Sequence, residues 1–496
     1  MRRVHKLLGL AGSLTVSFLT PSFATPSFAV EPETAEQPPE TEATPPPAAT
    51  PQVTAALAIS AAAARPKFGD VTTSGYLRGG FGGSDKKGRM TCFGIATPGG
   101  LVSKYRLGNE CEVWGEFHFR SVVHAGDDGS VASLHFMPTV YVPTTSIGYS
   151  PNATTSSPLV FTTSTGAMLA FPNLYADIQG IPWLAGGTAW MGTRYYKRES
   201  IYISDFFYWN PSGVGGGIED INLGRGVLLS YAAFAVDGDP AQTSSNTAPP
   251  TRDQGTFGVR NDLQLRGIHP WESGEVQLGF QYIADLSNGV DAGGNTVNHS
   301  SGWGVTLQLV QKLLGGDNKL AFQYGRGGGT GFGTLARFYY PDFSVQHTAS
   351  DLRYRVVDVL TIQPTPWLAG QVGLVYQHDE PANAAQKTDW FSGGTRMGIA
   401  FTEHAKLLGE VGFDRVKKGN GADPQWLAKV TVAPTIAAGR AANMRPELRL
   451  FFTWARWNQT AAVASVDSEK LYTSADANGI YTLSGYTAGM QAETWW

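Results

Sequence analysis

Three glutamates gather near residue 110, and a pair of carboxylates is what glycoside hydrolysis requires. Glu112 and Glu116 lie in a stretch that alternates polar and apolar residues, so both fall on one face of a strand. Glu110 belongs to the polar cluster before that strand. Arginines close by in sequence favour two ionised acids, whereas hydrolysis needs one acid that stays protonated. We therefore expect no enzymatic activity and no cofactor. We also expect no metal site, because no Cys-x-x-Cys motif or clustered histidine accompanies the two cysteines.

The same strand face also carries a large aromatic residue. Trp114 lies between the two glutamates, and His118 and Arg120 continue the face, while Val113 and Phe117 point to the opposite side. Sugars have ring faces that stack on aromatic side chains and hydroxyl edges that hydrogen-bond to charged groups. A face of this composition is suited to contact with a sugar in a narrow aqueous space.

The amino terminus has the three parts of a secretory signal peptide. Basic residues at 1–6 precede an apolar segment at 7–19, which is too short to span a bilayer, and small residues before position 30 supply a cleavage site. We therefore expect export, with residues 1–29 as the signal peptide. Cys92 and Cys111 then lie in an oxidising compartment, where we expect them to pair.

Residues 30–69 are rich first in proline, glutamate and threonine and then in alanine, a composition that cannot bury a core. We predict a flexible periplasmic linker or extension there, followed by one body at residues 70–496. The chain has 16% charged residues, against roughly 25% in ordinary soluble domains, and 60 glycines. Its net charge of -4 gives no reason to expect a nucleic-acid partner.

The body is predicted to be all-β. Alternating segments such as Phe257–Ile268, Met397–Glu403 and Leu448–Trp457 recur between turn signals such as Asn420-Gly421. The last segment alternates from Tyr486 and ends on an aromatic residue, which is typical of transmembrane β-strands. The body has room for roughly 16–20 such strands with their connections. The soluble alternative is a secreted β-propeller or sandwich.

Several motifs resemble the maltoporin family, the outer-membrane sugar channels that include the sucrose porins. The longest of them is the polar stretch Ser103–Glu112. Further matches follow in the same order along the body, at Ser74–Arg78, Trp190–Arg198, Asp205–Trp209, Arg445–Trp457 and Gln491–Trp496.

This resemblance implies a transmembrane antiparallel β-barrel of about 18 strands, with one loop folded inward to constrict the pore. It implies a homotrimer in the outer membrane of a Gram-negative bacterium, and a disulfide between Cys92 and Cys111 in the first external loop. The partners to expect are outer-membrane lipid, sugar solutes and a periplasmic sugar-binding protein.

The resemblance also assigns roles to lumen-facing residues. The family's aromatic sugar path matches Tyr76, Trp114 and Trp495, and Phe161 is the candidate for an aromatic residue that enters a neighbouring pore. The polar track and the constriction match Arg78, Arg106, Glu116, Arg198, Asp205 and Phe207. From alternation alone, the aromatic residues could equally belong to interfacial girdles, and the charges could solvate a general lumen.

Some positions depart from the family pattern. Phe207 stands where maltoporins generally have a tyrosine, and Asp317 and Asn443 fall where the lower aromatic residues of the path are expected. We predict an outer-membrane channel for facilitated diffusion of maltodextrins or other oligosaccharides, with the preferred sugar left open. The alternatives are a general diffusion porin with weak specificity and a secreted β-rich glycoside hydrolase.

Overall fold

A computed structural model of the chain describes residues 66–98, 102–143, 153–157, 160–163, 168–237, 257–286, 300–331, 348–442, 444–465, 471–472 and 479–496. The predicted signal peptide at 1–29, nearly all of the linker at 30–69 and Asn443 lie outside these residues. Strand β1 begins at Val71, next to the predicted start of the body.

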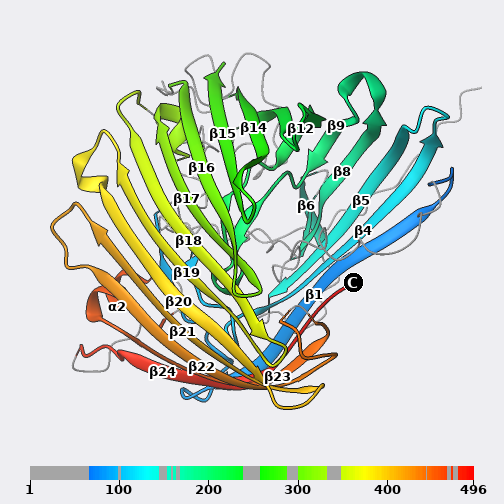
Figure 1. Cartoon of the computed structure of the whole chain (residues 1–496). Coiled ribbons are helices and arrows are strands. Elements are labelled where there is room, and N and C mark those ends of the chain that lie inside the picture. The colour runs from blue at the N-terminus through cyan, green and yellow to red at the C-terminus, as the bar shows by residue number, and fades with distance from the viewer. Residues whose placement is uncertain are drawn as a thin grey trace, which may run out of the picture. The chain divides into compact units, whose positions relative to one another are not determined.

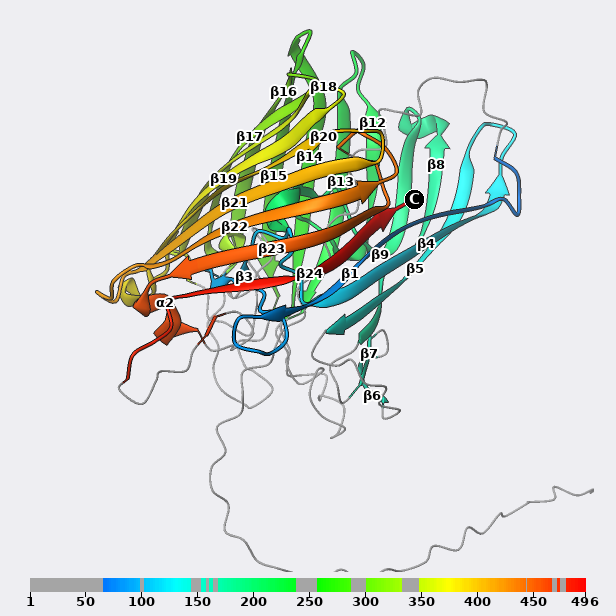
Figure 2. The same ribbon diagram turned by 90° about the horizontal axis from the view of Figure 1, so that it is seen from below.

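Most of the described residues belong to one antiparallel sheet that closes on itself (Figure 1). Of the twenty strands described in this sheet, β6 and β7 form a short hairpin beside β8, and the other eighteen make a ring. The first and last strands, β1 and β24, lie side by side and complete the ring (Figure 2). The prediction of an antiparallel β-barrel of about 18 strands is therefore confirmed.

The strands of the ring follow the chain order: β1 (Val71–Ser84), β4 (Glu112–Ala125), β5 (Val131–Pro143), β8 (Met168–Ile181), β9 (Gly187–Arg194), β12 (Gly213–Asn222), β13 (Leu228–Asp237), β14 (Phe257–Trp271), β15 (Gly274–Asp285), β16 (Gly302–Leu313), β17 (Gly316–Arg326), β18 (Leu352–Thr365), β19 (Leu368–Glu380), β20 (Thr388–Ala400), β21 (Ala405–Lys418), β22 (Gln425–Ala437), β23 (Glu447–Trp457) and β24 (Ser484–Trp495).

The connections contain only short elements among the described residues: β2 (Ile95–Ala96), β3 (Val102–Ser103), β6 (Ala153–Ser157), β7 (Val160–Thr163), β10 (Glu199–Ile201), β11 (Phe206–Trp209), α2 (Gln459–Ala464) and the 3-10 turns η3 (Pro182–Leu184), η4 (Tyr202–Ser204), η5 (Gly327–Thr330) and η6 (Ala384–Gln386). Within this described part, no helix is both long and apolar enough to cross a membrane.

The alternation along the strands separates an apolar outer face from a polar inner face. Leu77 and Phe117 are 40% and 36% exposed, whereas Arg78 and Glu116 beside them are 2% and 5% exposed. Exposed large apolar residues recur in this way around the ring, including Leu263, Leu307, Phe322, Leu374, Val430 and Phe452. An outer face of this kind suits lipid as its solvent, and the polar interior is the place to look for a site.

The two ends of the barrel differ in their connections. At one end, short turns join β14 to β15, β16 to β17 and β18 to β19, and the chain ends there after β24. At the other end, long connections such as residues 85–111 and 195–212 join the strands. In outer-membrane barrels the short turns face the periplasm and the long loops face outward.

One strand boundary differs from the prediction. Met397–Glu403 was expected to be a strand, but β20 ends at Ala400 and residues 401–404 form the turn to β21. The hydroxyl oxygen of Thr402 accepts hydrogen bonds from the backbone N–H groups of His404 and Ala405, at 3.3 and 3.0 Å. This local side-chain bonding competes with the sheet and ends the strand at Ala400. The alternation in the sequence continues past this point, so it gave the wrong boundary.

Two of the long connections fold into the barrel. We call residues 103–111 inner loop A and residues 195–212 inner loop B. In inner loop B, β10 and β11 pair with each other, and Ile203 N donates to Gln371 Oε1 on the wall at 3.1 Å. Tyr208 is fully buried, and its hydroxyl donates to Gln308 Oε1 at 2.7 Å. The inward-folded loop that was predicted is thus held by inward-facing wall residues.

Candidate functional site

The strand register brings five of the predicted site residues into two adjacent rows. Tyr76 on β1 lies opposite Glu116 on β4 and opposite Trp495 on β24. Arg78, two residues further along β1, lies opposite Trp114 on β4 and Glu493 on β24. Because residues two apart share a face, both rows point into the barrel.

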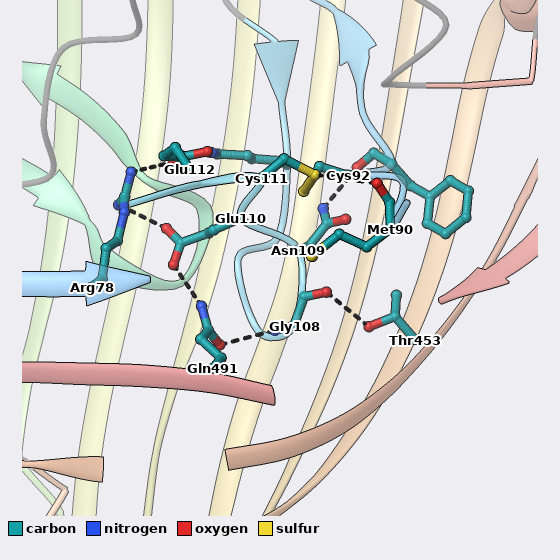
Figure 3. The surroundings of a disulfide bond; sticks show 12 residues. Arg78, Met90, Cys92, Gly108, Asn109, Glu110, Cys111, Glu112, Thr453 and Gln491 are labelled. Carbon is teal, nitrogen blue, oxygen red and sulfur yellow. Dashed lines mark hydrogen bonds and ion pairs between the residues drawn. A yellow bond between two sulfur atoms is a disulfide. The ribbon is translucent and has the colours of Figure 1, made fainter. Parts of the chain in front are cut away.

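Inner loop A covers much of this face, and it is buried along its length. Leu107 N donates to Glu410 Oε1 on β21 at 2.9 Å, and Gly108 N donates to Gln491 Oε1 on β24 at 3.2 Å. The carbonyl of Gly108 accepts from Thr453 Oγ1 on β23 at 3.4 Å (Figure 3). The disulfide between Cys92 and Cys111 ties the loop to the preceding segment, as predicted.

Two glycines on the wall make room for the ring of Tyr105 in inner loop A. A Cβ atom at Gly412 on β21 would lie 1.9 Å from Tyr105 Cδ2, and one at Gly394 on β20 would lie 2.2 Å from Tyr105 Cε1. The Tyr105 hydroxyl is 3.0 Å from Ser392 Oγ. Burial raises the pKa of Tyr105 well above its usual value, so the hydroxyl stays neutral.

Inner loop A, β1 and the first residue of β4 share a buried network of ion pairs, which inner loop B joins. We call it the balanced network, because its described members are three cations and three carboxylates: Arg78, Lys104, Arg106, Glu110, Glu112 and Asp205. Arg78 lies 2.7 Å from Glu110 and 2.5 Å from Glu112 (Figure 3). Arg106 Nε is 2.8 Å from Glu110 Oε1, and Lys104 Nζ is 3.2 Å from Glu112 Oε1. Their charges compensate one another, as buried ion pairs must.

Glu493 connects the balanced network to the middle of the barrel. It accepts hydrogen bonds from the hydroxyls of Tyr76 at 2.8 Å and Tyr202 at 2.5 Å. It also pairs with Arg106 at 3.3 Å and with Arg449 at 2.5 Å. Tyr76 is 1% exposed, so its ring offers no open face here.

Trp114 and Phe207 are also covered. Trp114 is 2% exposed, its indole N–H donates to Glu116 Oε1 at 3.2 Å, and its ring lies 5.9 Å from that of Tyr141. The guanidinium of Arg198 lies 4.9 Å from the ring centroid of Phe207. The predicted constriction residues are therefore brought together by the two inner loops.

Phe161 is placed only by its backbone. It lies in β7, opposite Leu169 of β8, and its side chain lies outside the described part of the structure. Its proposed entry into a neighbouring pore stays a prediction.

A cavity of about 980 Å³ opens in the lumen toward the end with the short turns. Trp495 and Tyr202 both line it, with ring centroids 6.3 Å apart and planes at 90°. Gly315 in the turn between β16 and β17 and Gln363 near the end of β18 line it as well. Of the three aromatic residues predicted for the sugar path, Trp495 is the one that borders this cavity.

Charged side chains from several strands line the same cavity. Glu199 of inner loop B lies 3.0 Å from Arg266 on β14 and 2.8 Å from Lys319 on β17. Burial alone would raise the pKa of Glu199, but the two cations outweigh burial and lower it. Glu199 is therefore ionised at neutral pH.

A second group lies beside Trp495. Glu447 at the start of β23 pairs with Lys406 at 3.3 Å and Arg445 at 3.2 Å, and also with Arg449. The guanidinium of Arg445 lies 3.9 Å from the ring centroid of Trp495. One face of this indole is thus already occupied by a cation.

Several of these residues were not named from the sequence. Glu447 and Arg449 lie on one face of β23, and Gln491 and Glu493 share the face of Trp495 on β24, so a period of two puts them in the lumen without giving them a role. Arg445 precedes β23 and had no periodic signal. Tyr202 lies in η4, inside inner loop B, and had no periodic signal. Its position follows from the folding of that loop.

The closed ring, the apolar outer face and the charged interior define an outer-membrane β-barrel channel. A family model for LamB porins matches residues 71–496, so the chain belongs to the LamB porin family, and the predicted maltoporin resemblance is confirmed. The protein is therefore located in the outer membrane of a Gram-negative bacterium, and its family indicates a channel rather than an enzyme.

Similar solved structures share little sequence with this chain. Pseudomonas aeruginosa OpdK with vanillate is 11% identical over 86% of this chain and 99% of that one, with a TM-score of 0.43. Acinetobacter baumannii OccAB1 is 8% identical over 86% and 97%, with a TM-score of 0.45. The trimer form of OmpT from Vibrio cholerae is 10% identical over 87% and 100%, with a TM-score of 0.37.

Proposed function

We propose that this channel passes sugars by facilitated diffusion, with the cavity at Trp495 and Tyr202 as its main sugar-contact site. The observation that supports this most is the pairing of two aromatic rings at 90° with charged side chains in one cavity of the lumen. Rings stack on the faces of a sugar, and charged groups hydrogen-bond to its hydroxyl edges.

The contacts must stay modest for a channel to conduct. A stacked aromatic pair contributes about 1 kcal/mol, and a site made of one or two such contacts lets its solute leave. Trp495 has one face covered by Arg445, so we propose that a sugar meets its remaining surface and the edge of Tyr202. Tyr76 and Trp114 are buried, and we propose that they position Glu493 and Glu116 through the hydrogen bonds that they donate to these carboxylates.

We further propose that the channel is a homotrimer, that residues 1–29 direct its export, and that Phe161 reaches a neighbouring pore. The family membership supports the trimer and the export. A periplasmic sugar-binding protein is the partner to expect at the end with the short turns, because a facilitated channel needs a sink on the inner side.

Planar-bilayer conductance titrated in turn with maltotriose, sucrose and glucose tests the sugar proposal. We expect at least one of them to block the current in a saturable way, as a binding site requires. An ohmic current that no sugar reduces would instead establish a general diffusion porin. Trp495→Ala should raise the half-blocking concentration about fivefold, in line with one lost aromatic contact. Trp183→Ala is the matched control, since Trp183 is 82% exposed in η3 outside the cavity.

A further inference from the structure

The cavity is lined by an excess of positive charge. Among the described lining residues, ten are lysine or arginine and three are aspartate or glutamate. We propose that the cavity binds anionic saccharides, meaning sugars that carry carboxylate or phosphate groups, in preference to neutral ones. This proposal rests on the proposed sugar function and names the class of sugar.

The excess persists when each carboxylate is assigned to the cations that contact it. Glu199 is shared by Arg266 and Lys319, which leaves one positive charge in that group. Glu410, on β21, is shared by Arg396 at 2.6 Å and Lys429 at 3.0 Å, with the same result.

The group beside Trp495 has the same imbalance. Apart from Arg106, which is counted in the balanced network, Glu447 and Glu493 together face Lys406, Arg445 and Arg449, so three cations share two carboxylates. In addition, the buried Nε of Arg445 has no hydrogen-bond acceptor among the described residues. A donor in this state increases the pull on an incoming anion.

Other charges near the cavity do not cancel this excess. Lys312 lies 4.0 Å from Asp317, Arg440 lies 3.3 Å from Glu403, and Lys197 lies 2.6 Å from Asp220, so these three pairs are neutral. Glu275 on the inner face of β15 accepts from Gln277 Nε2 and a backbone N–H, and it does not line the cavity. The three unbalanced groups therefore outweigh it by two charges.

The positions of the unbalanced groups fit a charged sugar. Arg445 and Trp495 are in direct contact, so a pyranose ring against the indole or against Tyr202 would hold an acidic substituent within reach of Arg445, Arg396 or Lys406. Side chains around the cavity are only partly solvated, which strengthens a charge-assisted bond relative to bulk water. A neutral sugar would leave these cations without the anion that they favour.

The charges can be reduced without leaving any carboxylate alone. In the triple variant Lys319→Gln, Arg396→Gln, Lys406→Gln, one cation is removed from each unbalanced group. Glu199 then keeps Arg266, Glu410 keeps Lys429, and Glu447 keeps two arginines. The matched control is Lys387→Gln, Lys417→Gln, Lys418→Gln, which changes the net charge equally. Its residues lie near the long-loop end of the barrel, about 40 Å from Lys406 along β21.

The experiment measures block of single-channel current in 0.1 M KCl, where screening is modest. The probes are maltotriose, trigalacturonate for carboxylates, and glucose with glucose 6-phosphate for phosphate. The neutral counterpart of trigalacturonate is maltotriose, and that of glucose 6-phosphate is glucose. We expect at least one of the two anionic probes to have a half-blocking concentration at least about tenfold below that of its neutral counterpart. The triple variant should lose most of this preference, and the control variant should keep it.

The outcomes separate the two proposals. Equal or tighter block by the neutral sugars overturns the anionic preference and leaves the sugar channel standing. Absence of block by every probe overturns both. A preference that survives in a folded triple variant overturns the assignment to this cavity. If the triple variant does not assemble, the preference of the wild-type channel for anionic probes is compared at 0.1 M and 1 M KCl. An electrostatic preference must shrink at the higher salt concentration, and one that does not shrink overturns the proposal.

Discussion

The barrel interior holds two sets of charged side chains that differ in their balance. In the balanced network under inner loop A, three cations meet three carboxylates, and all are nearly inaccessible. Around the cavity at Trp495, cations outnumber carboxylates, and the side chains border open space. Charge matched inside the protein holds a loop in place, whereas charge left unmatched beside a cavity is available to a solute.

The largest expected effect comes from breaking the balanced network. Arg78→Ala leaves Glu110, Glu112 and Asp205 with too few cations in a buried setting, which destabilises by about 3–5 kcal/mol. The midpoint of guanidinium unfolding in lipid vesicles measures this loss. A change of under 1 kcal/mol would show that the network does not hold inner loop A.

The disulfide is the second device that holds this loop. Cys92→Ser with Cys111→Ser removes a link across 19 residues of chain, with an expected loss of about 3 kcal/mol from the entropy of loop closure. The same unfolding measurement applies, and reduced wild-type protein should match the double variant. Equal stability of oxidised and reduced protein would contradict this expectation.

A smaller effect is expected where inner loop A meets the wall. Gly412→Ala places a methyl group on the ring of Tyr105 and should destabilise by about 1–3 kcal/mol, while shifting the loop and the open-channel current. Gly409→Ala on the same strand is the control, since a Cβ atom there meets nothing within 4 Å. Similar behaviour of the two variants would argue against the close packing of Tyr105.

The smallest effect on stability is expected at the cavity. Lys319→Gln leaves Glu199 paired with Arg266, so the free energy of unfolding should change by about 1 kcal/mol or less. Measured beside Arg78→Ala, this variant compares the cavity charges directly with the balanced network. A loss as large as that of Arg78→Ala would place Lys319 among the residues that hold the fold.

Local patterns predicted the barrel and the faces of its strands. The alternation at Tyr76, Arg78, Trp114 and Glu116 needs only a period of two, and the structure confirms that these side chains point inward. The ends of strands were less certain, because Thr402 stops β20 through bonds that do not interrupt the alternation.

The contents of the lumen could not be predicted in the same way. Inner loop A is anchored at Glu410 and Gln491, which are about 300 to 380 residues further along the chain, and periodicity carries no information about such pairs. A signal was present at Gly394 and Gly412, since glycine inside a strand marks a close approach by another group. The unbalanced groups at the cavity come from seven strands, from inner loop B and from the connection that holds Arg445, and only the closed barrel brings them together.

The zero-current potential of the wild-type channel between 0.1 M and 0.01 M KCl tests the role of the cavity charges most directly. We predict a potential whose sign shows that chloride passes more readily than potassium, and a clearly smaller value for the Lys319→Gln, Arg396→Gln, Lys406→Gln variant. A potassium-selective potential, or one that the triple variant leaves unchanged, would contradict the view that unmatched cations at this cavity determine what the pore admits.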